Sequence, residues 1–86
     1  MIKIFSKPNC PFCVKAKEYL DELELEYAVV DITKDAMGHS FMVGEGHKTV
    51  PQLYYGTSLL VAGGYDGLAS HTKEQISSLI GDMNVT

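Results

Sequence analysis

Two cysteines, Cys10 and Cys13, are the residues of this 86-residue chain that most directly suggest chemistry. They are the only cysteines in the sequence, and Pro11 and Phe12 separate them. Residues three apart are neighbours on a helix, so such a pair at a helix start lies close enough for a disulfide. The pair can be a structural disulfide, two ligands of a metal, or a reactive thiol–disulfide couple.

A helix is predicted to begin at or just after Cys10, because Pro11 suits the first helical position, where its missing N–H costs nothing. The apolar positions that follow recur on one helical face, and they are Cys13, Ala16, Leu20 and Leu23. The unpaired N–H groups and the dipole of a helix start stabilise an anion at Cys10 more than at Cys13. We therefore expect a lowered pKa for the Cys10 thiol, which makes it the nucleophile. Cys13 is expected to be more shielded and placed to attack a mixed disulfide formed at Cys10.

The interpretations of the pair as a structural disulfide or as two metal ligands have less support. A disulfide that closes so short a loop adds little stability. A zinc site needs four ligands, and the histidines at 39, 47 and 71 lie far from the cysteines without ligand spacing. We therefore predict no metal site made by this chain alone, and we interpret His39 and His47 as surface loop residues.

The rest of the chain predicts the elements that position the cysteines. Strands are expected at 2–6, 27–32, 50–55 and 59–62. Helices are expected from Cys10 onward, near 36–43, and within 68–83, where Thr72 and Gln75 resemble a capping box. The order β-α-β-α-β-β-α predicts an α/β fold, in which a parallel pair and an antiparallel hairpin form a small mixed four-stranded sheet flanked by three helices.

Composition excludes several classes of function. The net charge is -4 and the sequence contains no arginine, which argues against nucleic acid binding. No apolar run approaches the roughly 20 residues of a membrane helix, and the first residues lack the apolar core of a signal peptide. We predict one domain, 1–86, in the reducing cytoplasm, where a lone cysteine pair is more often catalytic or metal-binding than structural.

Three stretches together resemble the glutaredoxin family of the thioredoxin-fold superfamily: "SKPNCPFCVKAK", "TVPQLYY" and "GGYDGL". In that family a Cys-Pro-aromatic-Cys site opens the first helix. A Thr-Val-Pro stretch supplies a cis-proline that faces this site, and a Gly-Gly-x-Asp turn lies beside both. The resemblance extends from Ile2 to about Ile80, so it implies a thioredoxin-like fold.

The resemblance implies a dithiol glutaredoxin with Cys10 and Cys13 as its catalytic residues. Such an enzyme reduces protein disulfides and glutathione mixed disulfides, and it donates electrons to client enzymes such as ribonucleotide reductase. Glutathione is then a cosubstrate and no cofactor is tightly bound. The implied partners are glutathione and disulfide-bearing or glutathionylated proteins, and the implied state is a monomer.

The resemblance also implies a glutathione groove formed by Lys7, Phe12, Thr49, Val50, Pro51, Gly64, Tyr65 and Asp66. The backbone of Val50 would pair with the cysteine of glutathione, and Lys7 would pair with its glycine carboxylate. The "GGYDG" turn would hold the γ-glutamyl end. A purely structural alternative is that Asp66 caps a helix. Two features depart from the family. Phe12 stands where many members carry tyrosine, and the usual basic or amide group of the second helix is not evident, which leaves His39, Lys48 or Gln52 as candidates.

Two alternatives remain open on the sequence. The first is a thioredoxin-like donor reduced by a flavoprotein reductase, although the usual Trp-Cys-Gly-Pro-Cys is absent. The second is an iron–sulfur cluster carrier, in which two Cys10 thiolates and two glutathiones hold the cluster between two chains. Pro11 argues against the carrier, because cluster binding in the family tends to go with a small residue at that position.

Overall fold

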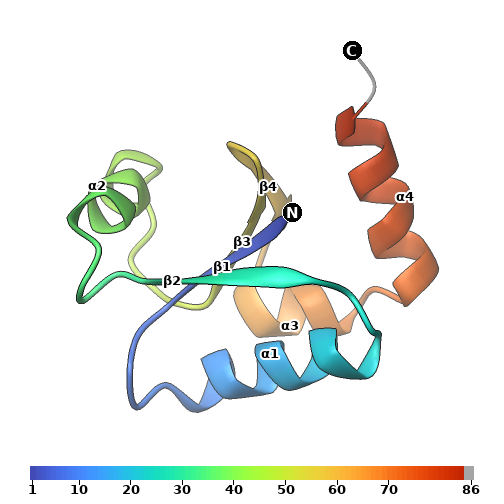
Figure 1. Ribbon diagram of the computed structural model, residues 1–86, viewed down its shortest axis with the longest axis horizontal. Coiled ribbons are helices and arrows are strands. Elements are labelled where there is room, and N and C mark those ends of the chain that lie inside the picture. The colour runs from blue at the N-terminus through green and yellow to red at the C-terminus, as the bar shows by residue number, and fades with distance from the viewer. Residues whose placement is uncertain (85–86) are drawn as a thin grey trace.

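The computed structural model describes residues 1–84, in which strands and helices alternate largely as predicted. The strands are β1 (Ile2–Ser6), β2 (Tyr27–Asp31), β3 (Gln52–Tyr55) and β4 (Ser58–Val61). The helices are α1 (Pro11–Glu22), α2 (Ala36–Gly44), α3 (Gly64–Ala69) and α4 (Lys73–Asn84) (Figure 1). None of the helices within this described range has the length and apolar character needed to cross a membrane.

The four strands form one mixed sheet in the order β2-β1-β3-β4. Strand β1 pairs in parallel with β2 and antiparallel with β3, and β3 pairs antiparallel with β4. The hairpin turn between β3 and β4 contains Gly56 at a φ of 63°, a left-handed conformation that glycine adopts without steric cost. The predicted combination of a parallel pair and an antiparallel hairpin is therefore confirmed.

The two faces of the sheet are covered by different helices (Figure 1). Side chains alternate between the faces of a strand, so Ile4 and Phe5 point to opposite sides. The face of Ile4 packs against α1, α3 and α4, in a core that includes Leu20, Leu68 and Ile76. Among the described residues, the face of Phe5 packs against α2, through a smaller cluster that includes Met42 and Tyr54.

The C-terminal region differs from the prediction, because it forms two helices and not one. The "GGYDG" segment, expected as a turn, is the start of α3, and Leu68 belongs to this short helix. The predicted capping box then starts α4. The Gln75 N–H donates to Thr72 Oγ1 at 3.1 Å, and the Thr72 N–H donates to Gln75 Oε1 at 2.8 Å. Within residues 1–84 the mixed sheet is therefore flanked by four helices in place of the expected three.

Candidate active site

The two cysteines lie at the start of α1, as the sequence predicts. Cys10 is the N-cap residue, with extended φ and ψ of -116° and 99°, and Pro11 is the first helical residue. A disulfide joins Cys10 to Cys13, whose Cα atoms are 5.2 Å apart. The Cys13 N–H also donates to Cys10 Sγ at 3.2 Å. The Cys10 sulfur therefore accepts a hydrogen bond from one of the otherwise unpaired N–H groups of the helix start.

The two sulfurs differ in their access to solvent. Cys13 lies on the buried face of α1 and is 1% exposed, whereas Cys10 is 9% exposed. The chain turns from β1 into α1 through Asn9, whose φ of 59° is left-handed, a conformation that asparagine tolerates better than most residues. The expectation that Cys13 is the more shielded sulfur is confirmed.

A segment 40 residues further along the chain meets the Cys10 sulfur. The Val50–Pro51 peptide bond is cis, as the Thr-Val-Pro motif implies. The carbonyl oxygen of Val50 lies 3.8 Å from Cys10 Sγ. The side-chain amide of Gln52 donates to the carbonyl oxygen of Thr49 at 3.1 Å and to its hydroxyl at 3.3 Å. The backbone of this segment is thus held beside the redox pair.

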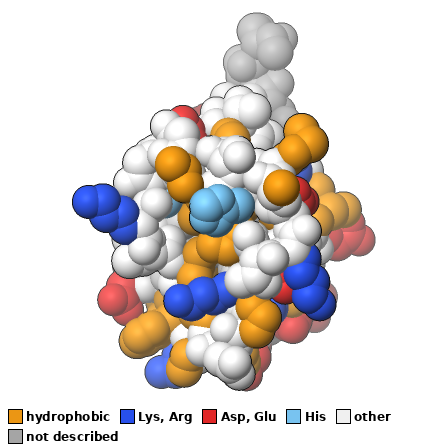
Figure 2. Space-filling view, turned by 90° about the vertical axis from the view of Figure 1, so that its left-hand side faces the viewer, with side chains coloured by type: hydrophobic (Ala, Val, Ile, Leu, Met, Phe, Trp, Pro, Cys, Tyr) orange, Lys and Arg blue, Asp and Glu red, His pale blue; other side chains and the backbone are white. Residues whose placement is uncertain are grey.

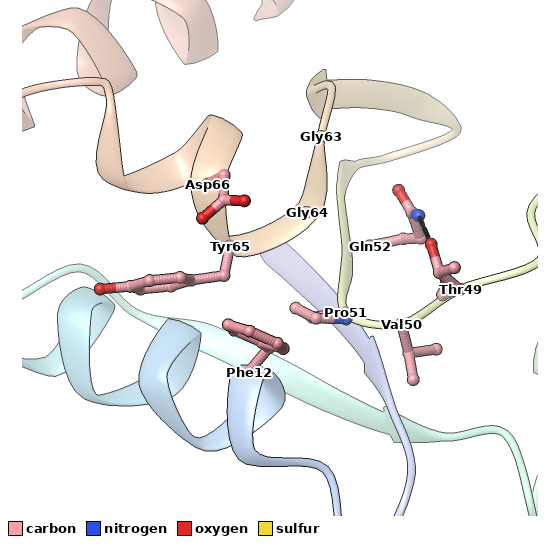
Figure 3. A pocket seen from close by; sticks show the side chains of 9 residues that line it. All are labelled: Phe12, Thr49, Val50, Pro51, Gln52, Gly63, Gly64, Tyr65 and Asp66. Atoms are coloured by element: carbon pink, nitrogen blue, oxygen red, sulfur yellow. Dashed lines mark hydrogen bonds between the residues drawn. The ribbon is translucent and has the colours of Figure 1, made fainter.

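One cavity of about 340 Å³ lies between the cis-proline segment and the start of α3, and we call it the diglycine cavity (Figure 3). Seven of the predicted glutathione-groove residues line it: Phe12, Thr49, Val50, Pro51, Gly64, Tyr65 and Asp66. Gln52 and Gly63 complete its wall. Gln52 is one of the three candidates for the group that meets the glycine carboxylate, and it lies in this cavity, where its side chain donates to Thr49.

Close contact between backbones holds α3 beside the diglycine cavity. Gly64 has a φ of 60°, and a Cβ atom at this position would lie 2.9 Å from the carbonyl oxygen of Pro51. A Cβ atom at Gly67 would lie 1.6 Å from the carbonyl oxygen of Ala62. Both glycines therefore let α3 approach its neighbours more closely than any other residue allows. No sequence pattern distinguishes Gly67, although it is the third glycine of "GGYDG".

Asp66 faces the diglycine cavity from the first turn of α3 (Figure 3). The N-cap residue of α3 is Gly63, at a φ of 90°, and no side chain caps this helix. The alternative interpretation of Asp66 as a helix cap is therefore wrong. Its exposed carboxylate remains available to a ligand in the cavity.

An aromatic pair closes one side of the diglycine cavity. The rings of Phe12 and Tyr65 stack with centroids 6.3 Å apart and planes 29° apart. Lys15 Nζ lies 5.4 Å from the Phe12 centroid and 6.0 Å from the Tyr65 centroid, within the range of a cation–π contact. Phe12 is 53% exposed, so this pair joins α1 to α3 at the surface and presents an apolar wall beside the cysteines.

A second cavity of about 280 Å³ adjoins the first at Thr49 and Val50, and we call it the lysine–histidine cavity. Its lining includes Lys7, His39, His47 and Lys48, together with apolar residues of α2. Figure 2 shows this side of the molecule, where lysines and hydrophobic side chains surround an exposed histidine. Of the three candidates for the missing basic group of the second helix, His39 and Lys48 therefore lie with Lys7, and Gln52 does not.

The interpretation of His47 as a surface loop residue is incomplete, because its ring contacts a buried side chain. It is partly buried, and its Nε2 atom lies 2.5 Å from the hydroxyl oxygen of Tyr54. His39, in contrast, is exposed on α2, in keeping with the expectation of a surface residue. No sequence pattern links His47 to Tyr54, because the contact joins a loop to a buried strand.

Comparison with known proteins identifies relatives of this chain. The profile of the glutaredoxin family matches residues 2–60. A glutaredoxin from Ricinus communis is 31% identical over 84 residues, which cover 92% of this chain and 80% of the relative. Hybrid peroxiredoxin hyPrx5 from Haemophilus influenzae is 39% identical over 70 residues, or 81% of this chain, but the chain spans only 28% of that longer protein.

Solved structures agree with the sequence relatives. The holo form of glutaredoxin C1 from Populus tremula x tremuloides superposes with a TM-score of 0.73 at 26% identity. The match covers 99% of this chain and 79% of the other. The superposition therefore includes the strands, the helices and the site described above.

Proposed function

Because the chain belongs to the glutaredoxin family of thiol–disulfide oxidoreductases, we propose that it reduces protein disulfides and glutathione mixed disulfides with electrons from glutathione. The observation that carries the proposal is the position of Cys10 Sγ, which lies 3.8 Å from the Val50 carbonyl oxygen where the two cavities meet. A peptide-like thiol compound bound along this segment has its sulfur next to Cys10. The requirement for glutathione and the identity of the client enzymes are part of this proposal, and separate experiments test each of them.

The charges of the two cavities support glutathione as the compound that occupies them. Glutathione carries a carboxylate at each end and an amine at its γ-glutamyl end. We place the glycine carboxylate in the lysine–histidine cavity, where Lys7 and Lys48 supply ammonium groups and His39 a further donor. We place the γ-glutamyl end in the diglycine cavity, where Asp66 supplies a carboxylate for the amine. The tripeptide then runs past the cis-proline segment as an added strand.

The proposed reaction starts with the Cys10 thiolate. It attacks the glutathione sulfur of a glutathionylated substrate, so a Cys10–glutathione disulfide forms and the substrate leaves as a thiolate. A second glutathione thiolate then attacks the glutathione sulfur of this mixed disulfide. Glutathione disulfide leaves and the Cys10 thiolate returns, so one free glutathione has taken the place of the substrate thiol in the disulfide.

With a protein disulfide, Cys13 takes part in the cycle. Cys10 first forms a mixed disulfide with the client and releases one client thiolate. The Cys13 thiolate then attacks Cys10 Sγ, which releases the second client thiolate and leaves the Cys10–Cys13 disulfide seen here. Two glutathiones reduce this disulfide in turn. The position of Cys10 at the helix start supports its role as the first nucleophile, because the helix dipole stabilises its thiolate.

The test is reduction of a glutathione mixed disulfide of a small thiol, coupled to glutathione and glutathione reductase. Wild type, Cys10→Ser and Cys13→Ser are compared. The proposal expects turnover by wild type and Cys13→Ser, and none by Cys10→Ser. Reduction of wild type by a thioredoxin reductase, with no turnover on glutathione, would overturn the glutathione assignment and leave the fold intact.

Client enzymes are proposed to be those that form a disulfide in each catalytic cycle, with ribonucleotide reductase as one example. The similarity to part of a protein named as a hybrid peroxiredoxin supports a peroxidase as a second example. The assay is reduction of each oxidised enzyme by the dithiol protein with glutathione present. Faster reduction by wild type than by Cys13→Ser identifies a client that uses both sulfurs.

A further inference from the structure

The segment between α2 and β3 carries Thr49 and Val50, the two residues common to both cavities. Its position decides where a bound substrate meets Cys10. The bonds from Gln52 to Thr49 hold the end of the segment that precedes β3. The start of the segment is held differently, by a side-chain contact from His47, which lies outside the three quoted stretches, to Tyr54 of β3.

That contact is centred on Tyr54. Its side chain is 2% exposed and packs edge-on against Phe41, with ring centroids 5.0 Å apart, and against Phe5, at 5.6 Å. The ring therefore has a fixed place between the sheet and α2. Its hydroxyl oxygen lies 2.5 Å from His47 Nε2 and 3.5 Å from Glu45 Oε1. The ring of His47 meets that of Tyr54 edge-on, at 5.6 Å and 83°.

The hydroxyl of Tyr54 keeps its proton near neutral pH, because burial and the nearby Glu45 carboxylate raise its pKa. It can donate that proton to His47, or accept from His47 and donate to Glu45. Either arrangement ties the histidine to the buried ring. His47 is also held through its backbone, since its N–H donates to the carbonyl oxygen of Met42 at 3.0 Å. The start of the segment is thus attached to α2 and to β3 together.

We propose that His47 is a positioning residue, whose hydrogen bond to Tyr54 holds Thr49 and Val50 at the place where substrate meets Cys10. The inference rests on the proposed function only for the identity of the substrate. Neither His47 nor Tyr54 touches the reacting sulfurs in this role. His47 also lines the lysine–histidine cavity, whereas Tyr54 lines neither cavity, so in the proposed role both act through the backbone of Thr49 and Val50.

The test compares His47→Ala, Tyr54→Phe, the double variant and the conservative His47→Gln. Loss of the hydrogen bond is expected to raise KM for the glutathione mixed disulfide by about three- to tenfold, the factor that one net hydrogen bond contributes. The kcat is expected to change much less, because the cysteines keep their geometry. The double variant is expected to match the single variants, since both remove the same bond. His47→Gln is expected to recover most of the loss.

Tyr27→Phe is the matched control. It also removes a tyrosine hydroxyl that donates to a carboxylate, at 3.0 Å from Asp21, but Tyr27 lines neither cavity. A lower melting temperature for His47→Ala, with KM equal to that of wild type, would overturn the inference and leave His47 with a purely structural role. Effects of His47→Ala and Tyr54→Phe that multiply in the double variant would also overturn it.

A second measurement needs no substrate and keeps the inference separate from the proposed function. Amide hydrogen exchange of residues 49 and 50 is expected to be about three- to tenfold faster in His47→Ala and Tyr54→Phe than in wild type. Exchange within α1 is expected to stay unchanged. If wild type shows no glutathione turnover, the proposed function fails and this exchange result still decides the role of His47. Equal exchange in wild type and both variants would overturn it.

Discussion

The diglycine cavity and the lysine–histidine cavity adjoin at Thr49 and Val50, yet they are built in different ways. The first depends on backbones in close contact, since Gly64 in its wall stands where a Cβ atom would meet the carbonyl oxygen of Pro51, and Gly67, further along α3, makes a similar contact with Ala62. The second depends on side chains, because its polar character comes from lysines and histidines on α2 and on two loops.

The difference predicts how each cavity responds to change. A backbone contact tolerates no added atom, so substitutions of the glycines that let α3 approach its neighbours should have large effects that salt does not alter. A charged side chain at the surface acts through the solvent, so substitutions in the lysine–histidine cavity should have small effects that salt screens.

The largest effect is expected for Gly67→Ala. The added Cβ atom would lie 1.6 Å from the carbonyl oxygen of Ala62, so α3 must move away from the end of β4. We expect the free energy of unfolding to fall by about 3 kcal/mol, the upper end for overpacking a tight contact. Denaturant unfolding measures this change.

Gly81→Ala is the control for this prediction. Gly81 lies within α4, where no atom comes within 4 Å of an added Cβ. Alanine has the higher helix propensity, so this variant should be more stable than wild type by about 0.5–1 kcal/mol. Equal destabilisation by both substitutions would contradict the role given to the contact between Gly67 and Ala62.

Gly64→Ala should affect binding more than stability. Its Cβ atom would approach the carbonyl oxygen of Pro51 at 2.9 Å, which pushes α3 away from the cis-proline segment and changes the diglycine cavity. We expect KM for the glutathione mixed disulfide to rise by about tenfold or more, equivalent to about 1.4 kcal/mol of lost binding. Steady-state kinetics at low and at high salt should give the same ratio to wild type.

Gly56→Ala separates backbone strain from the collision at Gly64. Gly56 has a φ of 63°, close to the 60° of Gly64, but no atom lies within 4 Å of its added Cβ. Both variants should lose stability from the left-handed conformation, by about 1 kcal/mol or more. Only Gly64→Ala should raise KM. A similar rise in both would show that the cavity responds to general destabilisation.

Lys7→Gln and Lys48→Gln should have smaller effects. Both lysines are exposed and line the lysine–histidine cavity, where we place the glycine carboxylate. Each substitution is expected to raise KM by about two- to fivefold at low salt, in keeping with exposed charge pairs. The ratio to wild type should shrink as salt increases. Lys73→Gln, which removes an exposed lysine at the start of α4, should leave KM unchanged.

The smallest effect is expected for Asp31→Asn, which should alter stability and neither cavity. Bonds from the hydroxyl and the N–H of Thr33, together with the nearby Lys34 and Lys17, lower the pKa of Asp31 below 3.8. A lowered pKa in the folded state stabilises the protein at neutral pH, and this stabilisation is lost as the pH falls through that pKa. Wild type should therefore melt slightly above Asp31→Asn at neutral pH. The two melting temperatures should converge in acid, and KM should be equal at neutral pH.

The Cys10–Cys13 pair and the element order could be predicted from the sequence because they depend on local patterns. A proline at the first helical position, apolar residues on one helical face and alternating strands are set by neighbours in the chain. They predicted the helix start at Cys10, the buried position of Cys13 and the mixed sheet, all of which are confirmed. The cis-proline and the residues of the diglycine cavity came from the resemblance to a family, not from local pattern.

The way in which distant segments meet depends on long-range packing. The separation of α3 from α4, the contact between Gly67 and Ala62, and the division of the predicted groove residues between two cavities all depend on contacts across the fold. The same is true of His47, which looks like a loop residue until the buried ring of Tyr54 is placed beside it. Local sequence determined which residues can react, because propensity and spacing act between neighbours. Packing of the sheet against its helices decided what surrounds those residues, because it joins positions that no short-range pattern connects.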